Sequence, residues 1–282
     1  MALEIESDEI EKWVKSLRKK NGLEWTTIDK TRYVMSRVYE NGQIHCGLPK
    51  GEEGNPVLLV RCKTTSDYEP ILVTPEQVFD ILQELPELER MLTLLIAATG
   101  LRISEALGLQ WGDVDYENSK INVRRSWKTK FGTQPTKNTQ SKAAIPMHPL
   151  LAELLKVWQQ KTMYAKSTDW LFPSYKAKGR TPRTGNMLVE DHLRPAALRV
   201  GVKGVEDESR RFGFHNLRHA LSTYLITKAK VDPKVVQKIL RQSDINTTLN
   251  IYTHAMTDDR IEAQGLMMEK LVQQKPTSEA VN

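Results

Sequence analysis

The sequence predicts a mainly α-helical protein with a small antiparallel β-sheet, an α+β fold whose 282 residues are divided between two domains. Three observations predict this class. Apolar residues recur at the three- and four-residue spacing of helices through most of the chain. Residues 120–127 alternate with a period of two, and a turn rich in Gly, Pro and Asn follows them. A change of composition near residues 63–73 indicates a linker.

Residues 1–63 are expected to form a small helical domain with two long helices. A loop rich in Gly, Pro and Asn spans residues 41–56, and residues 57–62 are expected to form a short extended piece. Residues 64–73 are the expected linker. The apolar positions that set the helical spacing are Ile10, Trp13, Val14 and Leu17 in the first helix and Ile28, Tyr33, Val34 and Val38 in the second.

Residues 74–282 are expected to form the larger, mostly helical domain. Thr74 can cap its first helix, with Pro75 at the first helical position and Gln77 completing a capping box. Gly100 is expected to end the second helix, over residues 87–99, and Asp232 to cap a later one. Further helices are predicted at residues 102–109, 150–160, 194–200 and 216–228, and strands at 120–127 and 142–148.

The net charge of +6 is unevenly distributed. Residues 1–80 hold 11 basic and 14 acidic residues, whereas residues 120–142 hold seven basic residues and no acidic one. A local positive field attracts polyanions such as nucleic acid, although a solvated charged surface has the same composition. The candidate DNA-binding residues of this basic strip are Arg124, Arg125, Lys128, Lys130 and Lys142.

The composition also limits the compartment and the cofactors. Cys46 and Cys62 are too few for a disulfide framework or a zinc cluster, which fits a reducing compartment. No apolar run approaches the ~20 residues of a membrane span, and the acidic first residues do not resemble a secretory signal. We therefore expect a cytoplasmic protein without membrane contact and without a metal site.

Two short motifs pair a cation with a second polar group. His215 and Arg218 lie three residues apart, so a helix places them on one face, where both can contact a phosphate. Arg102 follows Gly100, and Glu105 lies three residues further on, where it can hold the Arg102 guanidinium. Taken alone, the His215–Arg218 motif favours surface residues on an ordinary capped helix, and the Arg102–Glu105 pair is also explained by a surface ion pair.

Lys137 and Tyr252 add a proton donor and a nucleophile. Lys137 stands in a polar turn from which it can protonate a leaving oxygen, although most turn lysines are only solvated. A phenol has a pKa of ~10, so Tyr252 attacks only beside strong positive charge and a proton acceptor; otherwise it is a packing residue. Two arginines, a histidine, a lysine and a tyrosine together supply what metal-free phosphodiester cleavage requires.

The chain resembles the tyrosine recombinases, the phage-type integrase family. The motifs that carry the resemblance stand in the family's order between residues ~74 and 260. They are T-G-L-R-I-S-E-A-L-G-L-Q-W with Asp113 after it, T-K-N-T-Q-S-K-A-A-I-P-M, H-N-L-R-H-A and S-D-I-N-T-T-L-N-I-Y-T-H. The resemblance implies a catalytic domain at residues 74–282 and, at residues 1–63, part of the helical DNA-clamping domain, whose first helices are expected to be missing.

The resemblance also implies a role for each site residue. Arg102 and Arg218 would clamp the scissile phosphate, and His215 would accept a proton and bind the phosphate. Lys137 would be the general acid, and Tyr252 would form a 3′-phosphotyrosyl link. Glu105 would support Arg102. No cofactor is implied. The expected partner is double-stranded DNA, bound by a homo-tetramer; a monomer free in solution and accessory DNA-bending proteins remain open.

One site position departs from the family pattern. Gln242 stands where the family usually has a histidine or, less often, a tryptophan. A glutamine amide can donate a hydrogen bond to a phosphate oxygen but cannot be protonated. Losing one such donor costs ~10²–10³-fold in rate when nothing replaces it.

Two functions therefore compete. The first is a site-specific recombinase that cleaves and rejoins DNA, and the second is a degenerate integrase that binds DNA without turnover. A helix–turn–helix regulator built on residues 101–109 leaves the last two motifs unexplained, and a type IB topoisomerase shares the chemistry but not the motif spacing. The tail, with Leu266, Met267 and Leu271, suits a helix docked on a neighbouring protomer or on its own domain.

Overall fold

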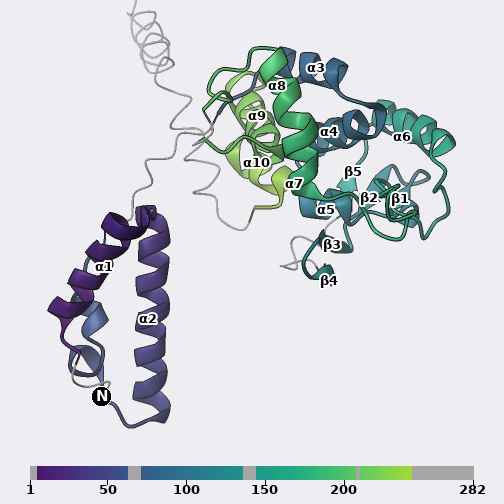
Figure 1. The fold of residues 1–282 in the computed structure, drawn as a ribbon. Helices are drawn as coiled ribbons and strands as arrows, with labels where there is room; N and C mark the ends of the chain where they lie inside the picture. Colours follow the sequence, from purple (N-terminus) through teal and green to yellow (C-terminus); the bar gives the residue numbers. More distant parts are fainter. Residues whose placement is uncertain (1–4, 63–70, 136–143, 208–209, 243–282) are drawn as a thin grey trace, which may run out of the picture. The chain divides into compact units, whose positions relative to one another are not determined.

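The computed structural model describes residues 5–62, 71–135, 144–207 and 210–242. The chain divides into two compact units, Met1–Glu69 and Pro70–Asn282, which are described separately below (Figure 1). Most described residues lie in helices, and the strands are short and antiparallel. The predicted class, mainly α with a small antiparallel β component, is therefore confirmed.

The smaller unit is built on two helices, α1 (Ser7–Asn21) and α2 (Trp25–His45). Gly22 ends α1 in the left-handed conformation with a φ of 62°, which lets the chain reverse within three residues. Two short 3₁₀ helices, η1 (Gly51–Gly54) and η2 (Pro56–Leu59), close the unit. Its core consists of Ile10, Val14, Ile28, Tyr39, Val57 and Val60.

The prediction of an extended piece at residues 57–62 is wrong, because this segment begins as the 3₁₀ helix η2. The buried Asn55 side chain donates to the Ser36 carbonyl oxygen (3.2 Å) and to Ser36 Oγ (3.0 Å), which anchors the turn on α2. Pro56 then occupies the first helical position, where its fixed φ favours a helical turn. Val57 and Val60, three residues apart, consequently reach the same core.

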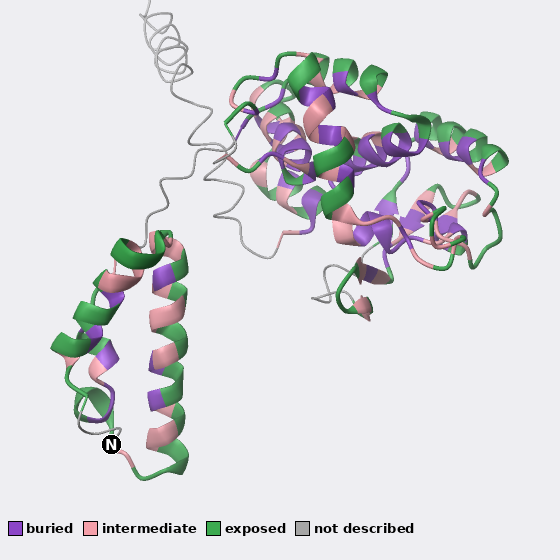
Figure 2. Cartoon of the chain, in the orientation of Figure 1, coloured by how far each residue is buried: buried purple, intermediate pink, exposed green. Residues whose placement is uncertain are grey.

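The expected apolar face of α2 is also wrong in part. Tyr33, Val34 and Val38 are 58%, 61% and 67% exposed, whereas Ile28 and Tyr39 are buried. Figure 2 shows the buried positions of α2 on the side facing α1 and exposed positions on the other side. Helical spacing identifies residues that share a face, but the partner element decides which face is covered.

The larger unit contains most of the helices. The predicted capping box of its first helix, α3 (Pro75–Glu84), is present: Thr74 Oγ1 accepts from the Gln77 amide (3.3 Å), and Gln77 Oε1 accepts from the Thr74 amide (3.0 Å). Asp232 caps the last described helix, as predicted. The others are α4 (Glu87–Thr99), α5 (Ile103–Leu107), α6 (Pro149–Lys161), α7 (Gly185–Leu188), a π turn (Val189–Leu193), α8 (Arg194–Arg199), α9 (Phe214–Thr227) and α10 (Pro233–Leu240).

The strands form two small antiparallel sheets rather than the single sheet expected. Strands β1 (Val114–Asp115), β2 (Lys120–Asn122) and β5 (Ala144–Pro146) pair in the order β1-β2-β5, with Ile121 opposite Ile145. The hairpin of β3 (Arg125–Lys128) and β4 (Gly132–Pro135) forms the second sheet. Ile121 and Val123 are buried in the core. The predicted strand at residues 120–127 is therefore divided after β2, and its second half, β3, belongs to the other sheet.

Helices α4 and α9 pack against each other at the centre of the unit. Leu92, Leu95 and Ile96 of α4 are fully buried, as is Leu217 of α9 at 1% exposure (Figure 2). This packing brings the C-terminal end of α4 and the loop after it close to the first turns of α9. Among the described residues, no helix is both long and apolar enough to cross a membrane.

Candidate functional site

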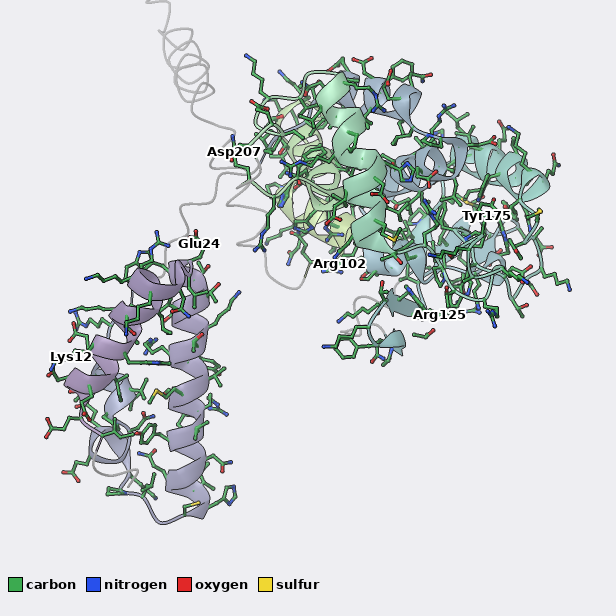
Figure 3. The ribbon with its side chains drawn as sticks, in the orientation of Figure 1. Lys12, Glu24, Arg102, Arg125, Tyr175 and Asp207 are labelled. Atoms are coloured by element: carbon green, nitrogen blue, oxygen red, sulfur yellow. The ribbon has the colours of Figure 1, made fainter. Side chains whose placement is uncertain are left out.

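The first part of the site is the junction between α4 and α5. Gly100 ends α4 in the left-handed conformation, with a φ of 64°. Arg102 is then the N-cap of α5 (Figure 3), and its amide donates to Glu105 Oε2 at 3.0 Å. Arg102 Nη1 donates to Glu105 Oε1 at 2.9 Å, so the spacing of three residues gives the contact that the sequence suggests. Glu105 is almost fully buried, whereas the Arg102 side chain is 41% exposed.

Helix α9 supplies the second arginine. Arg218 is 2% exposed and donates through Nη1 to the Gly100 carbonyl oxygen and through Nη2 to the Leu240 carbonyl oxygen. Burial, followed by the charge of Arg102, lowers the pKa of Arg218 to about 10, while Glu105 acts in the opposite direction. Arg218 therefore stays cationic at neutral pH and joins the ends of α4 and α10.

Two histidines of α9 lie beside this cluster. The rings of His215 and His219 meet edge to face, with 4.5 Å between their centroids. The His215 residue is exposed, although its ring is partly buried. This partial burial is the largest cause that lowers the pKa of His215, and the charges of Arg218 and Arg102 lower it further. Burial, His215 and Arg218 lower the pKa of His219 to about 4. Both rings are therefore neutral at pH 7, and His215 can accept a proton.

The end of α10 adds a third arginine that the sequence had not indicated. Arg241 is the C-cap of α10, with a φ of 52° in the left-handed region. Its side chain is 4% exposed, and its Nη2 donates to Glu105 Oε2 at 2.8 Å. The sequence did contain one indication of this role. Arg241 follows the predicted last helix, at the position where glycine usually adopts the left-handed conformation, and a non-glycine residue there often has a specific side-chain contact.

The cluster gathers residues from three separate motifs. Arg102, Glu105 and Arg218 act on one another electrostatically, and Arg102 and Arg218 both act on His215. Gln242 follows Arg241 directly, and its amide donates to the Gln237 carbonyl oxygen at 3.0 Å. The predicted residues Lys137, Lys142 and Tyr252 lie outside the described residues, as does the tail with Leu266, Met267 and Leu271.

Four of the candidate DNA-binding residues, Arg124, Arg125, Lys128 and Lys130, lie on and beside the β3–β4 hairpin. Lys128 and Lys130 are exposed, and Arg124 is exposed beside Asp113, with 3.6 Å between Nη1 and Oδ1. Arg125, labelled in Figure 3, has a structural contact as well, because its Nη1 donates to the buried Asp113 Oδ2 at 2.6 Å. The three exposed cations are consequently better placed to contact a polyanion than Arg125.

Chemically, the cluster is suited to an oxyanion. Three guanidinium groups surround one carboxylate, and a neutral imidazole lies beside them. Guanidinium groups donate in a planar fork that matches phosphate oxygens. Within the described parts of the chain, no group of three or more His, Cys, Asp or Glu side chains is arranged to hold a metal ion.

Comparison with known proteins identifies the family of this chain and several relatives. Residues 67–258 match the phage integrase family. The tyrosine recombinase XerD of Neisseria meningitidis serogroup A is 29% identical over 226 residues, which cover 76% of this chain and 68% of the relative. The XerD of Rickettsia bellii is 28% identical over 271 residues, which cover 91% of this chain and 81% of the relative.

Solved structures share the fold over nearly the whole chain. The Tn1549 transposon integrase, in complex with a circular intermediate DNA, superposes with a TM-score of 0.70 at 23% identity, covering 95% of this chain and 86% of that chain. The XerH site-specific recombinase, bound to a palindromic difH substrate, gives a TM-score of 0.64 at 20% identity, covering 94% of this chain and 73% of that chain. At these identities, the superpositions establish the fold.

Proposed function

Because the chain belongs to the phage integrase family, we propose that it is a site-specific DNA recombinase that cleaves and rejoins strands through a 3′-phosphotyrosyl intermediate. The observation that carries this proposal is the convergence of Arg102 and Arg218 around Glu105, from motifs more than a hundred residues apart. Clustered guanidinium groups neutralise the negative charge that develops on a phosphorane-like transition state.

In the proposed cleavage step, the oxygen of Tyr252 attacks phosphorus and the bond to the 5′ oxygen breaks. The neutral ring of His215 accepts the phenolic proton, and Lys137 protonates the departing 5′ oxygen. Arg102 and Arg218 hold the non-bridging oxygens. A 5′-hydroxyl of the partner strand later attacks the phosphotyrosine and releases Tyr252. The phosphotyrosyl bond conserves the energy of the broken backbone bond, so the step needs no cofactor.

The substrate of this chain is double-stranded DNA, a proposal supported by the circular intermediate DNA bound in the Tn1549 integrase complex. We assign residues 74–282 to the catalytic domain, residues 64–73 to the linker and residues 1–63 to a helical DNA-clamping domain. We further propose that the chain acts as a homo-tetramer on two duplexes, with DNA-bending proteins as accessory partners. The proposed compartment is the cytoplasm. The basic residues Arg124, Lys128, Lys130 and Lys142 contact the phosphate backbone, and Arg125 orients that surface.

Covalent capture tests the proposal before the target sequence is identified. The full chain is incubated with a pool of nicked duplexes, randomised on both sides of the nick, and then denatured. We expect a protein–DNA adduct with the wild type and none with Tyr252→Phe. Tyr175→Phe is the matched control, since Tyr175 is 43% exposed and packs beside Tyr164; its adduct should be unchanged.

Gln242 favours the second candidate, an integrase remnant that binds DNA without turnover. A neutral amide at this position cannot be protonated, which weakens charge neutralisation at the phosphate. If the wild type retains duplex DNA in a filter assay but forms no adduct with any member of the pool, this second function replaces the first.

A further inference from the structure

Arg241 holds a backbone conformation that its residue type disfavours. A φ of 52° places it in the left-handed region, where a Cβ atom crowds the following carbonyl oxygen and where glycine usually ends a helix. Such a residue persists when the surrounding structure compensates for the strain. At Arg241 the backbone amides of the cap donate to the carbonyl oxygens of Gln237 and Lys238, and the side chain turns into the protein toward Glu105.

The guanidinium of Arg241 is only partly satisfied. Nη2 donates to Glu105 Oε2, whereas Nε and Nη1 are buried and have no hydrogen-bond partner in the part of the chain that the structure describes. Buried donors in native proteins almost always find an acceptor, and an exception calls for a specific explanation. An acceptor supplied by a ligand would satisfy both nitrogens.

The charge around Arg241 points to the kind of acceptor. Arg102 and Arg241 share the single carboxylate of Glu105, while Arg218 is bonded to two neutral carbonyl oxygens. Among the described residues of this cluster, three cations thus face one anion. A desolvated excess of positive charge is costly unless an anion compensates it. Arg102 is the most exposed of the three arginines, so an anion can reach the cluster on its side.

We propose that Arg241 is a third arginine ligand of the scissile phosphate, donating from its unpaired guanidinium nitrogens to a non-bridging oxygen. The inference rests on the proposed recombinase function for the identity of the anion. Arg241 also places a fixed positive charge next to the neutral Gln242. The cluster then needs no protonated side chain at residue 242 to neutralise the phosphate.

The first test measures binding of inorganic sulfate, a mimic of the phosphate dianion, by the full chain. Thermal unfolding is followed against sulfate at constant ionic strength, with chloride as the reference salt. We expect sulfate to stabilise the wild type and Arg241→Gln to weaken its affinity by about ten-fold or more, the value of one charge-assisted hydrogen bond. Arg241→Gly, which suits the left-handed backbone, should weaken it equally and covers the case in which the glutamine variant fails to fold.

Arg199→Gln is the matched control. Arg199 Nε lies 2.7 Å from Glu84 Oε2 in an exposed ion pair, so this variant also removes an arginine from a carboxylate. Its sulfate affinity should equal that of the wild type. A wild type that does not bind sulfate, or an Arg241→Gln affinity within about two-fold of the wild type, would overturn the assignment.

The second test separates a phosphate ligand from a residue that only positions Glu105. A duplex recovered by covalent capture is resynthesised with a neutral methylphosphonate at the scissile position. If Arg241 neutralises phosphate charge, Arg241→Gln should slow adduct formation by ~10²–10³-fold on the phosphate and much less on the methylphosphonate. Equal slowing on both would identify a positioning role and overturn the proposal. Arg241→Lys keeps the charge without the planar fork, so its rate of adduct formation on the phosphate should lie between those of the wild type and Arg241→Gln.

The two proposals fail in different ways. If the wild type forms no adduct, the recombinase proposal fails, while the sulfate measurement still decides whether Arg241 binds an oxyanion. If the adduct forms normally and Arg241→Gln changes neither sulfate affinity nor the phosphate reaction, the recombinase proposal stands and the Arg241 assignment is overturned.

Discussion

Arg241 and Glu105, 136 positions apart in the sequence, form a buried ion pair in which Arg241 Nη2 lies 2.8 Å from Glu105 Oε2. The same carboxylate accepts from the amide and the guanidinium of Arg102. One side chain thus joins the start of α5 to the end of α10 and fixes two of the three site arginines. Fold stability and site geometry should therefore respond together when Glu105 changes.

Glu105→Gln should lower the free energy of unfolding and slow strand cleavage. Removing one partner of a buried ion pair leaves uncompensated charge and typically costs ~3–5 kcal/mol. Urea denaturation of the larger unit measures the stability change, and adduct formation measures the rate. Glu84→Gln breaks the exposed pair with Arg199 and should cost less than ~1 kcal/mol. Equal effects of the two variants would show that Glu105 does not hold the cluster together.

His219 should make stability depend on pH. The folded protein keeps this ring neutral down to a pKa of about 4, whereas the unfolded chain protonates it near its ordinary pKa of 6.5. Between these values the unfolded state binds more protons, so the free energy of unfolding should decrease as the pH falls from ~6.5 to ~4. The contribution is at most on the order of 3 kcal/mol.

Denaturation curves at several pH values measure this dependence. His219→Phe keeps an aromatic ring beside His215 but removes the titrating group, so its stability should decline less between pH ~6.5 and ~4. His45→Gln changes an exposed histidine of α2 and should leave the profile unchanged. A profile that His219→Phe does not flatten would mean that folding does not lower the pKa of His219.

DNA affinity should depend steeply on salt through the basic strip. Each neutralised phosphate contributes about −0.9 to the slope of log affinity against log salt. Lys128→Gln should therefore reduce the slope by ~0.9, measured by titration of duplex DNA at several salt concentrations. Lys156→Gln, on the outer side of α6, should preserve it. A slope that is the same in both variants would remove Lys128 from the DNA contact.

Gln242→His should raise the rate of adduct formation if glutamine is a weakened phosphate ligand. The gain should be larger in an Arg241→Gln background, because the introduced histidine can then supply the positive charge that the loss of Arg241 removes. Single-turnover cleavage by the four variants of this double-mutant cycle gives the coupling. An unchanged or slower rate in both backgrounds would show that glutamine is the better residue in this site.

Local features of the site and fold were predictable from the sequence. Residues three apart on a helix meet, which is why the Arg102–Glu105 contact and the Thr74 capping box follow from spacing alone. Gly100 and Asp232 mark helix ends for equally local reasons. These signals do not depend on the rest of the fold.

Features that depend on a distant partner were not predictable. The Arg241–Glu105 pair requires α10 to end beside α5, and no spacing along the chain indicates this. The covered face of α2 depends on where α1 and η2 pack, so Tyr33, Val34 and Val38 were wrongly expected in the core. The split of the strands into two sheets is likewise a matter of tertiary packing.

The most direct test of the proposed chemistry is the identity of the residue that carries the DNA. After covalent capture and nuclease trimming, trypsin releases residues 242–260, a peptide in which Tyr252 is the one tyrosine. Mass spectrometry should find a 3′-linked nucleotide on Tyr252 of this peptide. A nucleotide attached to any other residue, or DNA cleavage without a covalent peptide, would contradict the assignment of Tyr252 as the nucleophile that attacks the phosphate bound by the arginine cluster.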